Sequence, residues 1–249
     1  MSRPASPIRA ALALGAAELR VTARRGENVL VTMIIPAAVL LFFATSGIFP
    51  ARAGRPVDFL LPGALALAVI AAGLVNLGIA TAYERSYGVL KRLGGSPLPR
   101  WGLVAAKVGA VLILELLQVT VLFLVAAVAL GWRPGPGTSI PLFIGALLLG
   151  TLAFAGLGLL MAGRLRAEAT LALANGLFLA FLMVGGIILP VDHLPGPVQS
   201  IANVLPAAAL ADAFRAALGN GNDPTGPLAL LGAWGLGAAG LAVRTFRWE

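Results

Sequence analysis

Six long apolar runs constrain the fold more than any other feature of the sequence. They cover residues 29–48, 59–82, 104–130, 140–163, 169–190 and 228–246, and each is close to the roughly 20 residues that a helix needs to cross a bilayer. Because the bilayer core offers no hydrogen-bond partners to the backbone, such runs fold as helices. With 59% hydrophobic and 11% charged residues, the chain is far more apolar than a soluble domain. We therefore predict an all-α integral membrane protein.

Several function classes are excluded by residues that the chain lacks. It has no cysteine and one histidine, His193, which rules out disulfide scaffolds and Cys/His metal centres. A phosphate-binding P-loop needs GxxxxGK followed by Ser or Thr, yet the two lysines, Lys91 and Lys107, follow Leu90 and Ala106. HExxH and GxSxG are also absent. We expect no catalytic residues, no metal site and no cofactor bound by this chain.

The distribution of positive charge predicts the orientation in the membrane. With six spans, 14 of the 18 Lys and Arg residues fall on the side that holds both termini and residues 83–100, and 4 fall on the other side. Cytoplasmic loops carry such an excess. We expect a multi-pass protein of a bacterial inner membrane with both termini in the cytoplasm. The net charge of +8 then favours anionic lipid headgroups as partners, and no nucleic acid, because the basic residues flank apolar runs.

Residues 1–28 form a basic leader before the single membrane domain, which covers residues 29–249. In a helix, the leader would place three apolar and three basic residues on adjacent faces. These are Ile8, Leu12 and Leu19, and Arg9, Arg20 and Arg24. Such a helix would lie in the plane of the cytoplasmic headgroups. A solvated leader without this contact is the alternative.

Residues 83–100 are the long charged interruption of the apolar sequence, and we predict that they dock onto another protein in the cytoplasm. A helix would carry a charged face and an opposite, more apolar one. The first comprises Glu84, Arg85, Gly88, Lys91 and Arg92, and the second Tyr83, Ser86, Tyr87, Val89, Leu90 and Leu93. We expect Gly94 and Gly95 to end this helix, and Ser96 to cap a short second helix with Pro97 at its first position.

Residues 191–227 form the long loop on the opposite side. Val198, Ile201 and Leu205 recur at helical spacing, Pro206 breaks the run, and a second apolar series includes Phe214. Asp212 and Arg215 are three residues apart and can pair. We expect two short helices that dip back into the membrane from outside. Surface helices packed on the loop ends are the alternative.

Glu115 is the ionisable residue that lies deepest in a span. It is about 17 Å along the third run at ~1.5 Å per residue, with Gln118 on the same side one turn later. One interpretation is a polar patch on a substrate path. The other is an interhelical hydrogen bond, for example to Asn76 or Asn175 of other spans. We expect Lys107, near the cytoplasmic end, to extend its ammonium group to the interface.

Two motifs resemble those of ABC type-2 exporter permeases, such as the membrane subunit of the daunorubicin-resistance exporter. The loop after the second span has an acidic residue, then Gly, an aliphatic residue, Lys/Arg, Leu and Pro-Leu, here Glu84, Gly88, Val89, Lys91, Arg92, Leu93, Pro97 and Leu98. The outer segment has Pro206, then Asp212, Ala213, Phe214 and Arg215. The resemblance covers nearly the whole chain, including its leader and its six spans. It departs from many relatives at Gly94 and Gly95, where they have bulkier residues.

The resemblance implies the type-2 ABC exporter fold and an exporter of hydrophobic or amphipathic compounds, such as drugs, lipids or polyketide-like molecules. Two permease chains, identical or paralogous, would assemble with two ATPase subunits that bind ATP and Mg. The leader would be the interface helix, and the segment after Gly94 the coupling helix that docks on the ATPase. A six-span ion-coupled or passive carrier is the competing hypothesis. An intramembrane lipid-modifying enzyme is a weaker one, because motifs such as DxxDG are absent.

Overall fold

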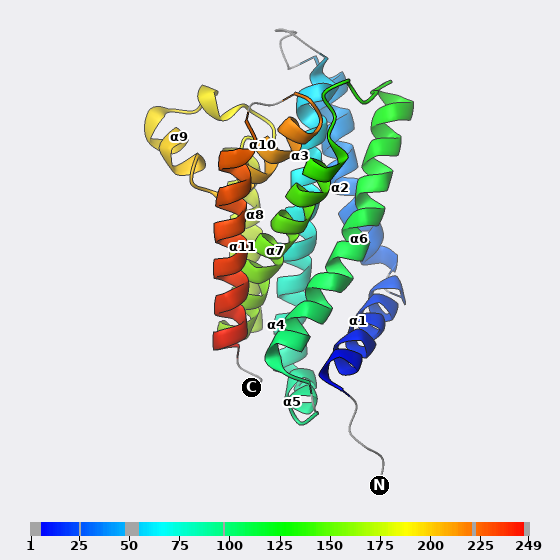
Figure 1. Ribbon diagram of the computed structural model, residues 1–249, viewed down its shortest axis with the longest axis vertical. Coiled ribbons are helices and arrows are strands. Elements are labelled where there is room, and N and C mark those ends of the chain that lie inside the picture. The colour runs from blue at the N-terminus through cyan, green and yellow to red at the C-terminus, as the bar shows by residue number, and fades with distance from the viewer. Residues whose placement is uncertain (1–5, 25, 48–54, 97, 221–222, 247–249) are drawn as a thin grey trace.

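The computed structural model describes residues 6–24, 26–47, 55–96, 98–220 and 223–246, and every regular element in these ranges is a helix (Figure 1). The elements are α1 (Pro7–Arg24), α2 (Gly26–Thr45), α3 (Pro56–Ile70), the π-helix η1 (Ala71–Asn76), α4 (Leu77–Ser86), α5 (Val89–Gly94), α6 (Arg100–Ala129), α7 (Ile140–Arg164), α8 (Ala167–Val184), the 3₁₀ turn η2 (Val191–His193), α9 (Gly196–Ala202), α10 (Pro206–Ala217) and α11 (Thr225–Thr245). The prediction of an all-helical fold is confirmed for the described residues.

Five segments are apolar and long enough to cross a membrane. They are Pro56–Ser86, in which α3, η1 and α4 are continuous, and helices α6, α7, α8 and α11. These segments correspond to five of the six predicted spans. The first predicted span falls on α2, whose apolar stretch Thr32–Thr45 is shorter, and its predicted end at residue 48 lies outside the described residues. The chain is a multi-pass membrane protein, and the sixth span stays a prediction.

Several helix ends differ from the predicted span boundaries by three to six residues, and two of these differences have a clear local cause. The third span begins at Arg100 instead of residue 104, because Pro99 in extended conformation caps α6 and Arg100 is exposed at the end of the helix. The fifth span ends at Val184 and not at residue 190. There Gly185 ends the helix and Gly186 takes a φ of +65°, a conformation that a side chain disfavours.

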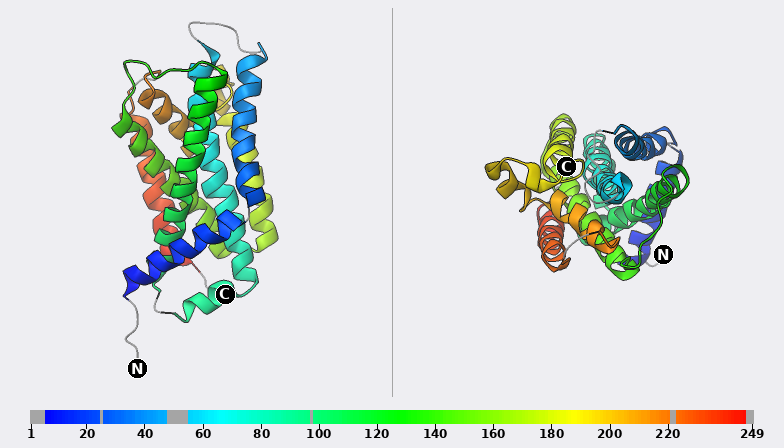
Figure 2. Two further views of the ribbon diagram at one scale, coloured as in Figure 1. Left: turned by 90° about the vertical axis from the view of Figure 1, so that its right-hand side faces the viewer. Right: turned by 90° about the horizontal axis from the view of Figure 1, so that it is seen from above.

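The long helices run along one axis, and the connecting elements gather at the two ends of the bundle (Figures 1 and 2). Helix α1, the connection from α4 to α5 and the end of α11 lie at one end, whereas α9 and α10 lie at the other. Figure 2 shows α1 running obliquely across the spans. Its residues Ile8 and Leu12 are exposed, while Ala11 packs inward, so the predicted apolar face points away from the bundle. Such a face is available to lipid.

The centre of the bundle is the contact between the second span and α7, where glycines bring the two backbones together. A Cβ on Gly158 would lie 2.5 Å from the Gly73 carbonyl oxygen, and one on Gly78 would lie 3.1 Å from the Gly158 Cα. Gly73 belongs to η1, so the π-helical turn lies at this close approach. The neighbouring Phe154 is fully buried. Backbone contact of this kind requires residues without side chains.

We predict that Gly158→Ala destabilises the protein by about 2 kcal/mol, the usual cost of an overpacked core. The added methyl group meets backbone, which cannot move aside as a flexible side chain would. Gly145→Ala is the matched control, because it lies on the same helix with no atom within 4 Å of its Cβ position. Thermal unfolding in detergent, followed by tryptophan fluorescence, measures both variants. Equal melting temperatures for the two variants would contradict this account of the contact.

Candidate functional site

The segment after the second span folds differently from the predicted helix over residues 83–93. Helix α4 ends at Ser86, and Gly88 takes φ +72° before the short helix α5 begins. The Gly88 N–H donates to the Arg85 carbonyl at 3.0 Å, so this glycine closes the end of α4. The prediction that Gly94 and Gly95 end a helix is confirmed, because α5 ends at Gly94, but the prediction of one continuous helix before them was wrong. A left-handed backbone conformation favours glycine, so Gly88 was itself a signal in the sequence that a helix ends at this position.

Residues 89–94 are therefore the short helix, and the predicted helix from Ser96 is absent from the described residues. The Ser96 hydroxyl donates back to the Leu93 carbonyl at 2.6 Å, so it closes a turn instead of capping a new helix. Pro97 lies outside the described residues. Pro99 then precedes α6 directly. A helix, a turn and a short helix are present, but the break lies at Gly88 and the short helix is Val89–Gly94 and not the predicted one after Ser96.

Helix α5 is held to the bundle by one fully buried side chain. Leu90 packs with Ala11 of α1, Leu98 and Leu103, together with Phe246 after α11. Leu93 of the predicted apolar face packs against the same cluster, but Tyr87 and Val89 do not, since Tyr87 is 74% exposed and Val89 43%. Lys91 and Arg92 are exposed, as predicted for the charged face. The tip of α5 thus presents basic side chains to the surroundings of the bundle.

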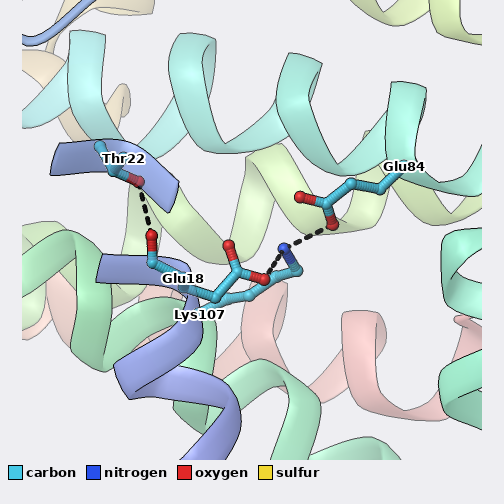
Figure 3. Close-up of polar contacts among 4 residues, drawn as sticks. All are labelled: Glu18, Thr22, Glu84 and Lys107. Atoms are coloured by element: carbon cyan, nitrogen blue, oxygen red, sulfur yellow. Dashed lines mark hydrogen bonds and ion pairs between the residues drawn. The ribbon is translucent and has the colours of Figure 1, made fainter. Parts of the chain in front are cut away.

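Lys107 joins three helices at this end of the bundle, which the sequence did not reveal. Its ammonium group lies 2.6 Å from Glu18 Oε1 of α1 and 2.8 Å from Glu84 Oε2 of α4, as Figure 3 shows. The Lys107 side chain is 1% exposed, so the prediction that it extends to the interface was wrong. An ammonium group is buried at this depth only when carboxylates pair with it. We call Glu18, Glu84 and Lys107 the carboxylate–lysine cluster.

Arg85 makes a second polar link, between α4 and the connection from α7 to α8. Its guanidinium donates to the Leu165 carbonyl. Leu165 directly follows α7, whose end would otherwise leave this carbonyl unpaired. Two of the four charged residues predicted to contact an ATPase, Glu84 and Arg85, therefore bind within the chain.

A groove of about 610 Å³ begins at the carboxylate–lysine cluster and runs between α1, α2, the second span and α6. Asn76 and Gln118, two of the four residues predicted for a translocation path, line it. Asn175 does not: it is exposed on α8 and its amide donates to the Leu171 carbonyl of its own helix at 2.9 Å. Glu115 does not line the groove either. The predicted polar patch is thus divided among three places.

Glu115 is buried between α6 and α7, where it accepts a hydrogen bond from the Thr151 hydroxyl. The interpretation as an interhelical hydrogen bond is confirmed, but the proposed partners Asn76 and Asn175 were wrong. Thr151 also donates to the Leu147 carbonyl at 2.7 Å, so its single hydrogen is shared. Glu115 Oε1 is buried and has no hydrogen-bond partner among the described residues. A threonine in an apolar run gives no signal of this contact in the sequence.

We predict that Thr151→Val lowers the stability of the protein by about 2 kcal/mol, because it leaves a second Glu115 oxygen buried without a donor. Thr151→Ser keeps the hydroxyl and is the control, with a loss below about 1 kcal/mol expected. The double variant Thr151→Val/Glu115→Leu should recover part of the loss, because both polar groups are then removed. Thermal unfolding measures all three. A double variant less stable than Thr151→Val would contradict this pairing.

At the opposite end, the predicted outer segment forms two helices, α9 and α10. Pro206 occupies the start of α10, as its position in the sequence predicted. Asp212 and Arg215 pair at 2.7 Å, which confirms the predicted i,i+3 contact. Arg215 also donates to the Gly186 carbonyl, and its guanidinium lies 4.2 Å from the centre of the Phe59 ring. These contacts connect α10 to α3 and to the end of α8.

Helix α10 is almost entirely buried, and it packs between α3, α7 and α11. Its Phe214 is fully buried, 5.0 Å from the ring centre of Phe143 on α7. Helix α9, in contrast, projects beside the bundle in Figure 1 and exposes Ile201. Of the two predicted helices, α10 has the packing expected of a segment that turns back into the bundle. Beyond it, the Thr225 hydroxyl and N–H donate to Asp223 and lower the pKa of this exposed carboxyl.

A bundle of long apolar helices, with an oblique helix and a short basic helix at one end, defines the chain as a multi-pass membrane protein. Its sequence matches the ABC-2 type transporter family over residues 9–218, and the chain belongs to this family. The predicted resemblance is confirmed. Members of the family are membrane translocation subunits and not enzymes, and they work with an ABC ATPase in a separate subunit.

Two curated relatives are similar over most of the chain. A Bacillus subtilis (strain 168) protein whose name describes it as a transport permease, YvfS, is 27% identical over 195 residues, which cover 77% of this chain and 78% of the relative. An Escherichia coli (strain K12) protein named as a multidrug ABC transporter permease, YbhS, is 26% identical over 168 residues. That match covers 67% of this chain and 44% of the relative, so the chain corresponds to less than half of YbhS.

Proposed function

We propose that this chain is the permease subunit of an ATP-driven exporter that moves hydrophobic or amphipathic compounds out of the cytoplasm or the inner leaflet. The observation that carries the proposal is the end of the bundle at α5. A short helix with exposed Lys91 and Arg92 is attached there through Leu90 to α1 and α6. A partner that moves α5 would act directly on these two helices. The name of YbhS, a multidrug permease, supports the export of such compounds.

The carboxylate–lysine cluster can transmit a movement of α5 to the membrane-spanning helices. Lys107 lies on α6, and its two carboxylate partners lie on α1 and α4, so a displacement of α6 strains both ion pairs and a displacement of α1 or α4 strains one. Buried pairs of this kind resist separation, because each unpaired charge is costly to bury. We propose that α1, α4, α5 and α6 move together when the ATPase subunits close around ATP and Mg. The second and third spans would then transmit the change toward α10.

The remaining assembly follows from the same proposal. Two ATPase subunits act on two permease chains, which are copies of this chain or paralogues, in the inner membrane of a bacterium. The end with α1, α5 and the end of α11 faces the cytoplasm, which agrees with its larger share of Lys and Arg. The first span is α2, completing six. Helix α10 is a re-entrant segment at the outer end, and its burial among three spans supports this role.

Purification of the tagged chain from its native cells together with an ABC ATPase tests the proposal. We expect a stable complex in mild detergent, with Mg-dependent ATP hydrolysis that the chain alone lacks. In inside-out vesicles, the complex should accumulate a hydrophobic fluorescent dye only when ATP is supplied. Dye accumulation that needs an ion gradient and no ATPase would instead support the ion-coupled carrier and overturn this proposal.

A further inference from the structure

The groove beside the carboxylate–lysine cluster has the dimensions and lining of a ligand site. Its volume of about 610 Å³ lies within the range of small-molecule pockets. It opens on the surface of the chain, because Asn76 and Tyr87 in its lining are exposed. On α6 it extends from Lys107 to Gln118, which is about 16 Å at ~1.5 Å per residue. An elongated molecule therefore fits it better than a compact one.

The lining changes character along the groove. At the α1 end lie the charged groups of the carboxylate–lysine cluster, and at the far end lie two amides, Asn76 and Gln118. Between them the lining is aliphatic, with Ala72, Leu77, Ile79, Ala80, Val111 and Leu114. The groove thus has a charged end, an apolar middle and a polar far end. This order matches an amphipathic molecule that has a charged headgroup and a second polar group along its chain.

Gln118 supplies independent evidence that the groove receives a ligand. The residue is 4% exposed, and its Nε2 donates to the Thr32 carbonyl at a long 3.4 Å. Its Oε1 is buried and accepts no hydrogen bond from any described residue. A buried acceptor without a donor costs free energy that a bound hydroxyl or N–H would recover. The amide therefore fits a donor group on a molecule in the groove.

The charged end selects against anions. Two carboxylates and one ammonium group line it, and both carboxylates lie within 2.8 Å of Lys107 Nζ. A phosphate or a carboxylate headgroup would meet two like charges there, while the single cation is already paired. The rings of Tyr83 and Tyr87, with centres 6.0 Å apart, also line this end and can attract a cation through their faces.

We propose that this groove binds an amphipathic compound with a protonated amine, placing the amine beside Glu18 and Glu84, the hydrophobic body along α4 and α6, and a donor group at Gln118. This inference rests on the proposed function, for which it names the substrate class. A compound held there lies between α1, α4 and α6, the helices that the carboxylate–lysine cluster joins. Binding and the movement of these helices are thereby linked.

Photolabelling tests the site without requiring transport. The probe is a dodecylamine with a diazirine in its chain, added to the full-length protein in phosphatidylcholine nanodiscs without nucleotide. We expect labelled peptides from α4 and α6. Unlabelled dodecylamine should protect them at a concentration roughly tenfold lower than dodecanoate, because only the anion is repelled. Equal protection by the amine and the carboxylate, as expected for a lipid held without regard to charge, would overturn the proposal.

Three variants test where the probe binds and whether Glu18 contacts its amine. Ala80→Phe fills the groove and should abolish labelling, whereas Ala127→Phe, at an exposed site of α6 outside the groove, should not. Glu18→Gln should reduce the preference for amine over carboxylate roughly two- to fivefold, the scale of one partly exposed charge contact. If Glu18 had only a structural role, Glu18→Gln would weaken protection by dodecylamine and by dodecanoate equally. Unchanged labelling in Ala80→Phe would place the bound probe elsewhere and reject the site.

Gln118→Met tests the far end of the groove. A dodecylamine with a hydroxyl group in its chain should protect more strongly than plain dodecylamine in the native protein, and equally in this variant, because the acceptor is gone. Equal protection in the native protein would remove Gln118 from the site. The labelling result is separable from the proposed function, because labelling needs no ATPase. If the groove binds the probe but ATP-driven dye accumulation is absent, the exporter function is rejected and the binding site is retained.

Discussion

Lys107→Met should destabilise the protein by about 3 kcal/mol and detach α1 from the bundle, because the variant leaves two carboxylates together without their cation. Both carboxylates lie within 2.8 Å of the same nitrogen, and their side chains are only 20% and 27% exposed. Removal of one partner of a buried ion pair costs more than the pair contributed. Since α1 is joined to α4 through this nitrogen, the position of α1 should respond most strongly.

The chain has no cysteine, so a single introduced cysteine can report on α1. Ala11→Cys places it at a position that is 8% exposed. We expect maleimide labelling of this residue to increase at least roughly tenfold when Lys107→Met is added, which corresponds to about 1.4 kcal/mol of weakened docking. The triple variant with Glu18→Gln and Glu84→Gln is the control and should restore protection, because no charge is left unpaired. Unchanged labelling in Lys107→Met would show that the cluster does not hold α1.

Leu90→Asp should abolish ATP-driven transport while the chain remains inserted and folded. Leu90 is fully buried and is the buried residue of α5, and a carboxylate in its place costs on the order of 3 kcal/mol unless the helix leaves its site. A helix of six residues held in this way should detach. The spans make most of their contacts with one another, so their thermal unfolding should shift little.

Dye accumulation in vesicles and co-purification of the ATPase measure the effect, and we expect both to fall at least roughly tenfold. Leu90→Met is the matched control: it preserves volume and should cost less than about 1.5 kcal/mol. Retained coupling in Leu90→Asp would remove α5 from the mechanism. The resemblance placed the coupling helix after Gly94, whereas the short helix α5 ends at Gly94.

Sequence reasoning was accurate where one-dimensional periodicity is the cause of the structure. Long apolar runs form helices regardless of their neighbours, since the backbone must satisfy its own hydrogen bonds. Local pairs such as Asp212 and Arg215 were also predictable, because they lie three residues apart on one helix. Pro206 fixed the start of α10 for the same local reason.

Predictions from the sequence were less accurate where two conformations compete over a few residues. Gly88 was assigned to a continuous helical face, yet it takes the left-handed conformation that ends α4. The pair Gly94–Gly95 gave the more obvious signal, and helix α5 ends there, so both positions terminate helices. Lys91 and Arg92 of this segment are exposed, and their docking on a partner stays a prediction.

The helical membrane fold, the absence of a nucleotide-binding loop and the family motifs can be predicted from the sequence, because each depends on residue type along one chain. Which polar groups meet depends on the packing of the helices. Glu18 and Lys107 are 89 residues apart in sequence, and Glu115 and Thr151 are 36 apart. Such contacts depend on which faces of the helices pack together. Glycine contacts such as that between Gly73 and Gly158 decide which faces pack together, because they let two backbones approach closely. Hydrophobic periodicity does not encode these contacts.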